Sequence, residues 1–450
     1  RVPFALLAVL GALTALGPVT MELYTPSLPR LAQFFGVGLA EVQGTISSMM
    51  ATFGVAQVFV GNLSDTLGRR PIVAAGLALY TYASLSSALA HSIAQLQLQR
   101  AAQGVGSAVA MVTGQALVRD YFPDLKTRER VTSRLASVRA GCPLLAPILG
   151  AYLQLWLDWP ATFVCMAALG LATLWGTRLI PPAPPKNPAG GAGLCALLRA
   201  SLGLLRESEF LSYVCADVCN FVGFINYVTT ASYVLQVHYG VPLARFGLIY
   251  GVNAVGLILG SELSHRLSSV RGMGGQRGVL HLALGVSTVG AAALLVVGLS
   301  PGLAASYWAL VVPSAVYNVG RGALTVQCIT LALEKHPAQA GLASGLMFAV
   351  RAVVSAIAIT ALGVVYDEKG AEDGEGSRPD AGPGPLCVAM ALSQACALGL
   401  YTLLRWRALR TGPAAGADRA QGMAAFDGAA EGAELEAGAA DGSLPAVQPE

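Results

Sequence analysis

The sequence predicts an all-α membrane protein of twelve transmembrane helices, arranged as two six-helix halves around a central cavity. Of its 450 residues, 54% are hydrophobic and only 12% are charged, with a mean hydropathy of +0.60. A soluble globular protein has about a quarter of its residues charged, so this chain lacks the charge to cover a water-facing surface. Glycine is abundant at 52 residues, and small side chains let transmembrane helices approach one another closely.

Twelve apolar segments are long enough to cross a bilayer, whose core of about 30 Å requires about 20 apolar residues per helix. The apolar run that begins at Arg1–Leu16 could be a signal peptide, but it continues past Gly17 without a small-residue cleavage site, so we assign it to the first span. The segments fall into two blocks of six, 3–29, 41–62, 71–91, 94–118, 134–155 and 160–180, then 210–237, 243–266, 278–299, 303–333, 341–366 and 384–409.

A linker separates the two blocks. Five prolines between Pro181 and Pro188 break any helix, and leucines at helical spacing with Arg199 and Arg206 then predict a short interfacial helix. We therefore expect an N-terminal half (1–180), a cytoplasmic linker with an interfacial amphipathic helix (181–209), a C-terminal half (210–410) and a disordered cytoplasmic tail (411–450). Two parallel six-span repeats of this kind surround a central cavity in secondary transporters.

Basic residues predict the orientation. With the N-terminus inside, the cytoplasmic loops hold eighteen Lys and Arg residues, whereas the external loops hold only Arg30, Arg245, Lys369 and Arg378. The positive-inside rule selects this arrangement. We expect a multi-pass protein of the plasma (cytoplasmic) membrane with both termini cytoplasmic, whose twelve spans can form a complete cavity in a monomer.

The loop after the second span reads Gly61-Asn-Leu-Ser-Asp65-Thr-Leu-Gly68-Arg69-Arg70. Gly61 and Gly68 permit tight packing and a sharp turn. Asp65 can accept from a helix N-terminus or pair with Arg69, which would latch the two halves in one conformation. An ordinary charged turn is the alternative, but five positions at fixed spacing resemble the cytoplasmic-loop signature of the major facilitator superfamily.

Further motifs resemble the twelve-span bicyclomycin/chloramphenicol-resistance family of drug:proton antiporters, from about residue 20 to 366. They are Glu22-Leu-Tyr24-Thr-Pro26, Arg100-Ala-Ala-Gln103-Gly104 and the fifth-span antiporter motif with Gly141, Pro143, Pro147 and Gly150. The resemblance implies the major facilitator fold, proton-coupled efflux of drug-like amphipathic molecules by alternating access, and no cofactor beyond the proton gradient. It also implies that the fifth-span motif seals the external path. The two prolines remove backbone donors and should bend that helix.

The sequence departs from this family at several positions. Glu22 replaces an aspartate and keeps the carboxylate, whereas Arg139 and Arg321 introduce charge on helices that face the cavity. Smaller departures occur at Ala151, Trp159-Pro160, Ser232 and Gln327. These changes leave the substrate open.

Ionisable residues inside the membrane are functional candidates, because burying their charge is costly. We expect Glu22 to carry the proton or bind a cationic substrate, with Arg100 modulating it; a carboxylate reaching the outer surface and an arginine bound to backbone carbonyls are the structural alternatives. Asp217 and Arg321 could form a charge pair across the cavity or a purely structural pair. Amides and phenols suited to lining the cavity, or to joining helices, are Tyr24, Asn220, Asn226, Tyr227, Tyr233 and Asn253.

Three functions remain open: drug efflux, proton-coupled transport of a metabolite, and a non-transporting receptor. An anionic metabolite is favoured by Arg139, Arg321 and Arg351, whereas the presence of the loop latch, Glu22 and the fifth-span motif together argues against a static receptor. The sequence contains no nucleotide-binding loop or hydrolase motif, so we do not expect an enzyme. Cys215 and Cys219 lack a nearby histidine, so we expect no metal site. The net charge of +3 gives no reason to expect nucleic acid, and the expected partners are lipid, protons and a small-molecule substrate.

Overall fold

Helices make up the computed structural model, which describes residues 4–181, 194–270, 274–300, 302–336, 339–372 and 382–410 without a strand in these ranges. The N-terminal block consists of α1 (Phe4–Glu22), η1 (Thr25–Ser27), α2 (Leu28–Phe35), α3 (Leu39–Leu67), α4 (Arg69–Ala88), α5 (Ile93–Tyr121), α6 (Leu125–Leu157), α7 (Pro160–Gly176) and η2 (Thr177–Leu179). The C-terminal block consists of α8 (Leu194–Arg206), α9 (Ser208–Tyr233), η3 (Val234–His238), α10 (Leu243–Ser268), α11 (Gly275–Leu299), η4 (Leu303–Ala305), α12 (Tyr307–Glu334), α13 (Ala340–Glu372) and α14 (Gly384–Arg410).

Each of the twelve predicted spans coincides with one long helix, the first being α1 continued through η1 into α2. Ten helices of the described part are long and apolar enough to cross a membrane. The other two, α4 and α12, have 20 and 28 residues. Their polar side chains, including Tyr80 and Ser84 in α4 and Asn318 and Arg321 in α12, lower the hydropathy. These side chains are buried against neighbouring helices, so they do not face lipid.

Large apolar side chains cover the outer surface of the bundle. Trp156 is 73% exposed, Leu299 68% and Trp175 67%, and they belong to three different helices. A soluble protein rarely exposes so much apolar surface around its whole circumference. The exposed side chains therefore fit a lipid environment.

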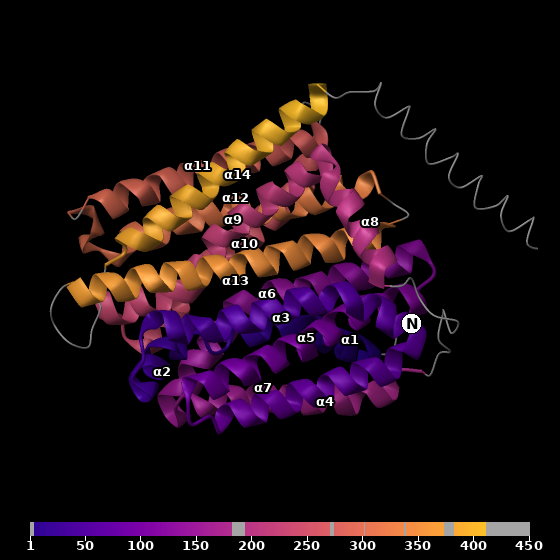
Figure 1. Ribbon diagram of the computed structural model, residues 1–450, viewed down its shortest axis with the longest axis horizontal. Helices are drawn as coiled ribbons and strands as arrows, with labels where there is room; N and C mark the ends of the chain where they lie inside the picture. Colours follow the sequence, from indigo (N-terminus) through magenta and orange to yellow (C-terminus); the bar gives the residue numbers. More distant parts are fainter. Residues whose placement is uncertain are drawn as a thin grey trace, which may run out of the picture.

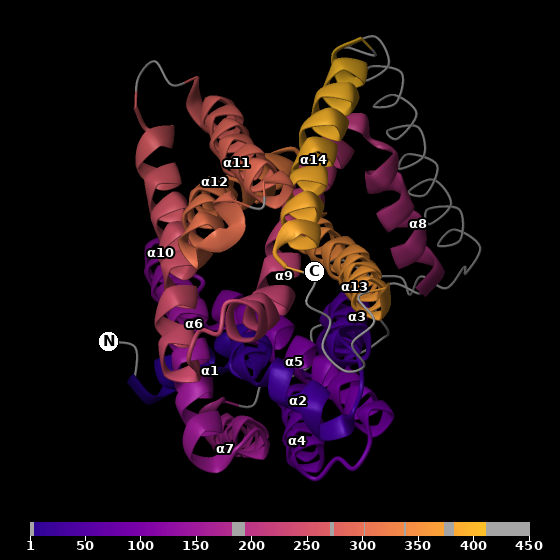
Figure 2. The same ribbon diagram turned by 90° about the vertical axis from the view of Figure 1, so that its left-hand side faces the viewer.

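The two blocks meet along two pairs of helices. In Figure 1 the indigo-to-magenta helices of the N-terminal block lie on one side and the pink-to-yellow helices of the C-terminal block on the other. Helix α3 packs along α13, and α6 packs along α10 (Figure 2). The α3–α13 and α6–α10 contacts therefore form the main interface between the two blocks.

Hydrogen bonds between the halves concentrate at one end of the bundle, which the basic residues predict to be external and which we call the predicted external end. The Asp367 carboxylate of α13 accepts from the backbone N–H groups of Leu39 (2.7 Å) and Ala40 (3.0 Å), the first residues of α3. Nearby, the Gln43 amide of α3 donates to the Thr230 hydroxyl of α9 at 3.0 Å. The structure therefore has the two halves joined at this end.

The predicted linker helix is present as α8, next to α9 and α13. Its Leu204 is buried with Phe210 of α9, whereas Arg199 and Arg206 are exposed. A position in the membrane interface and the boundaries of the four predicted regions stay predictions. The proline-rich part of the linker and the predicted disordered tail lie outside the described residues.

Candidate functional site

Glu22 lies at the C-terminal end of α1, where the chain turns through η1. Glu22 is only 4% exposed, and its Oε2 accepts a hydrogen bond of 2.9 Å from the Tyr250 hydroxyl of α10. This bond joins the N-terminal half to the C-terminal half. The predicted proton carrier is thus a buried carboxylate that accepts a hydrogen bond from a tyrosine of the opposite half.

Tyr250 continues into a chain of polar groups within the C-terminal half. Its ring stacks on Tyr227 of α9, with centroids 5.9 Å apart and planes at 22°. The Tyr227 hydroxyl accepts from the Asn253 amide at 2.7 Å, and Asn253 Oδ1 accepts from Asn318 of α12 at 2.9 Å. These contacts connect Glu22 to three helices of the other half, α10, α9 and α12.

Arg100 does not contact Glu22. Both terminal nitrogens of Arg100 lie 3.3 Å from the carbonyl oxygen of Thr20, and Nη1 also donates to Gln103. Its guanidinium covers the Tyr24 ring, 4.3 Å from the centroid. These contacts fix the end of α1 against α5, so Arg100 can act on Glu22 only by positioning the backbone two residues before it. Tyr24, a predicted cavity residue, is fully buried in the same contact.

Asp217 pairs with Arg351 of α13 and not with Arg321. Its Oδ2 lies 3.4 Å from Arg351 Nη1, and its Oδ1 accepts from the Thr325 hydroxyl at 2.8 Å. Arg321 instead lies over the Phe224 ring, 4.1 Å from its centroid. The structure therefore contains an Asp217–Arg351 pair in place of the predicted Asp217–Arg321 pair.

The remaining predicted cavity residues lie on α9. Asn220 donates to Gln394 of α14 at 2.8 Å, which joins two helices. Asn226 is 3% exposed and its Oδ1 has no hydrogen-bond donor, and Tyr233 is 7% exposed near the end of the helix. The Oδ1 atoms of both Asn220 and Asn226 are buried without a hydrogen-bond donor in the described part of the chain, so both amides have an unused polar atom.

Arg69 organises the predicted latch. It pairs with Asp65, as predicted, and also binds Asp120 of α5 (Nε to Oδ2, 3.1 Å) and the Ser64 hydroxyl (2.6 Å). Gly68 has φ +95°, a conformation that side chains rarely adopt, so the predicted sharp turn is confirmed. These contacts all lie within the N-terminal half. The pairing of Arg69 with Asp120, which directly follows Arg119 at the same predicted cytoplasmic end of a span, was not predicted.

The other latch and motif residues differ in how closely they pack. A Cβ at Gly150 would overlap the carbonyl oxygen of Leu23, so α6 approaches α1 closely there. At Gly61 and Gly141 a Cβ would meet no described atom within 4 Å, so the tight packing predicted at Gly61 is wrong and Gly141 makes no close approach either. Pro143 and Pro147 lie inside an unbroken α6, Leu125–Leu157. Arg70, the last latch residue, is partly exposed at the start of α4.

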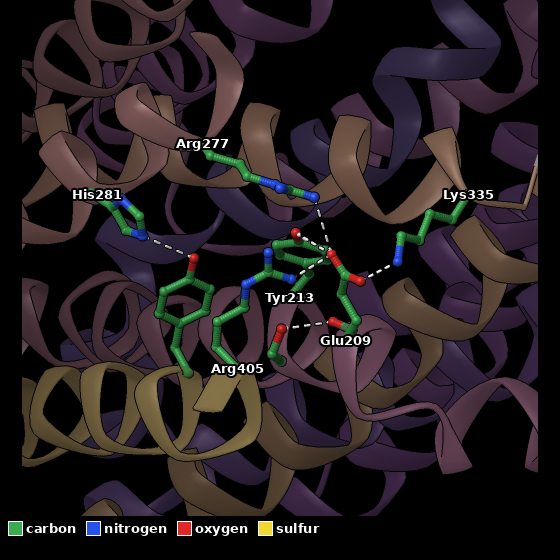
Figure 3. A network of polar contacts seen from close by, with 8 residues as sticks. Glu209, Tyr213, Arg277, His281, Lys335 and Arg405 are labelled. Carbon is green, nitrogen blue, oxygen red and sulfur yellow. Dashed lines mark hydrogen bonds and ion pairs between the residues drawn. The ribbon is translucent and has the colours of Figure 1, made fainter. Parts of the chain in front are cut away.

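A second charged cluster, centred on Glu209 of α9, was not predicted. Figure 3 shows that its carboxylate pairs with Lys335, Arg405 and Arg277. The distance from Arg277 Nη2 to Glu209 Oε1 is 3.3 Å, and the Tyr213 hydroxyl donates to the same oxygen at 3.2 Å. The three cations belong to the ends of α11, α12 and α14. One carboxylate thus joins four helix ends of the C-terminal half. The available signal was the acidic pair Glu207 and Glu209 among basic residues at the predicted cytoplasmic ends.

The family model of the Major Facilitator Superfamily matches residues 8–359. The chain belongs to this superfamily, and it is a membrane transporter. The chain is 29% identical over 355 residues to a bicyclomycin resistance protein homolog of Haemophilus influenzae, covering 79% of this chain and 87% of that one. It is 24% identical over 407 residues to multidrug resistance protein D of Escherichia coli, covering 90% and 96%.

Solved structures agree on the fold. The xylose transporter XylE from E. coli, in a partially occluded inward-open conformation, superposes with a TM-score of 0.65 at 12% identity. The match covers 89% of this chain and 97% of the other. The predicted major facilitator fold and the resemblance to drug-resistance transporters are confirmed.

Proposed function

We propose that this transporter exports drug-like amphipathic molecules in exchange for protons, by alternating access, and that it has no enzymatic activity. The hydrogen bond from Tyr250 to Glu22 carries the proposal. It places a buried, titratable group at a contact that the two halves must break when they separate.

Protonation gives this contact two states. An ionised Glu22 accepts a charge-assisted hydrogen bond from Tyr250, whereas a protonated one has lost that charge and is cheaper to bury apart from it. A cationic or polar substrate that binds Glu22 competes with the proton for the same oxygen atoms. Competition for one carboxylate is sufficient for antiport, and the names of the similar drug-resistance proteins support a drug as the exchanged molecule.

We further propose that the protein works as a monomer in the plasma membrane with both termini in the cytoplasm. The basic residues of the predicted cytoplasmic loops support this orientation.

Transport into proteoliposomes tests the proposal. Ethidium accumulation driven by an imposed pH gradient, acidic inside, is expected for the parent protein and expected to be lost in Glu22→Gln. Glu262→Gln, which alters an exposed carboxylate of α10, is the matched control and should transport normally. Full proton-driven transport by Glu22→Gln would refute the proposed role of Glu22.

A further inference from the structure

Arg321 is a buried cation without a polar partner. It lies in the middle of α12, is 5% exposed, and makes no hydrogen bond or ion pair within the described part of the chain. Its Nε is fully buried and unpaired. Its guanidinium carbon lies over the faces of Phe224 and Phe221, 4.1 and 4.8 Å from their centroids.

The carboxylates near Arg321 are engaged elsewhere. Asp217 is held by Arg351 and the Thr325 hydroxyl, and Glu22, whose charge also reaches Arg321 from the facing half, accepts from Tyr250. Arg351 itself lies 4.5 Å from the centroid of Phe221, so the two guanidinium groups share one ring, while the Asp217 carboxylate directly contacts only Arg351 of the two. Burying an unpaired arginine costs free energy, and a bound anion that pairs with the guanidinium would offset that cost.

We infer that Arg321 forms a subsite that anchors a carboxylate, and that the transporter takes amphipathic aromatic compounds bearing an acidic group in addition to cations such as ethidium. The guanidinium offers a planar fork of donors that matches a carboxylate. The phenyl rings beside it supply an apolar wall for the rest of such a molecule. This inference rests on the proposed transport function and names its substrate class.

Direct binding to the purified, detergent-solubilised protein tests the inference without any proton gradient. Equilibrium dialysis with tritiated indole-3-acetate is expected to show saturable binding. Unlabelled indole-3-acetamide, which has the same ring and size but no charge, is expected to compete at least about tenfold more weakly, because charge-assisted hydrogen bonds are the stronger class. Tryptamine, which carries a positive charge, should compete with labelled indole-3-acetate no better than the amide does.

Four variants separate the subsite from a general effect of charge. Arg321→Gln should lose the preference for the acid. Arg321→Lys, which keeps the positive charge, should retain most of it. Arg266→Gln removes an exposed arginine of the same half and should leave the preference intact. Asp217→Asn removes the carboxylate that neutralises Arg351, leaves a second unpaired cation beside Phe221 and should tighten binding of the acid.

Several outcomes would overturn the inference: no binding of indole-3-acetate at millimolar concentration, equal competition by acid and amide, or an acid preference that survives in Arg321→Gln. A protein that exchanges ethidium for protons but shows no acid preference would refute the subsite and leave the transport function standing. A protein that prefers the acid but shows no proton-driven transport would refute the proposed transport function and leave the Arg321 subsite standing.

Discussion

Replacing Asp367 with alanine is expected to open the predicted external end of the bundle. The carboxylate accepts from Leu39 and Ala40 at 2.7 and 3.0 Å, and so caps α3 from a helix of the other half. An N-terminal cap contributes about 1 to 2 kcal/mol, and charge at a helix N-terminus adds a fraction of that. A loss of about 2 kcal/mol shifts the equilibrium between closed and open ends about 30-fold, since 1.4 kcal/mol corresponds to a factor of ten.

Gly38 offers a second way to break the same contact. A Cβ at this residue would lie 2.7 Å from Asp367 Cγ, which is too close for both to remain. The backbone of Gly38 has φ −72° and ψ 173°, which alanine adopts freely, so Gly38→Ala should displace the carboxylate without straining the chain. Glu368→Gln changes the neighbouring exposed carboxylate and is the matched control.

Spin-label distances between the halves measure the effect. Labels on cysteines introduced at Gln33 and Arg245, both exposed at the predicted external end, report the separation in a background without native cysteines. Asp367→Ala and Gly38→Ala should both increase the population of long distances, and Glu368→Gln should not. Distance distributions that superimpose for all four proteins would show that this cap does not hold the halves together.

Three further predictions concern stability in detergent. Gly150→Ala should lower the thermal midpoint, at a cost of about 1 to 3 kcal/mol for overpacking against α1, whereas Gly141→Ala should have no such effect; equal midpoints would contradict the packing. Glu209→Gln leaves three cations without their shared carboxylate and should destabilise the C-terminal half, measured by a lower midpoint that added salt partly restores. Arg30 lowers the pKa of Asp158 through its hydrogen bond, so the stability from this pair is complete above the usual aspartate pKa and is lost as the pH falls through the lowered value. Asp158→Asn should remove that acid-sensitive part, which is less than about 1 kcal/mol for so exposed a pair, and unchanged acid sensitivity would argue against it.

Hydropathy and turn chemistry predicted the fold well. Ten spans are long apolar runs, and α4 and α12 carry more polar side chains. The breaks between the runs are too polar or too rich in proline to be anything but connections. The turn at Gly68 and its Asp65–Arg69 pair were also predictable, because both depend on residues a few positions apart in the chain. Local sequence therefore determines these features.

Partners across helices were not predictable. Asp217 lies with Arg351 and not Arg321, and Glu22 with Tyr250 and not Arg100, because the choice depends on the rotation and register of each helix. A run of apolar residues that is buried or lipid-facing on all sides carries little information about rotation. Tyr250 could have been noticed only from its position one turn before Asn253, on the same face of α10.

Proton release on substrate binding tests the central claim most directly. Purified protein in weakly buffered detergent solution, with a pH indicator, is mixed with ethidium near neutral pH, with Glu22→Gln and Glu262→Gln measured beside it. We predict that the parent and Glu262→Gln release protons in proportion to the ethidium bound, and that Glu22→Gln binds ethidium without release. Equal release from Glu22→Gln and the parent would contradict the assignment of Glu22 as the proton carrier.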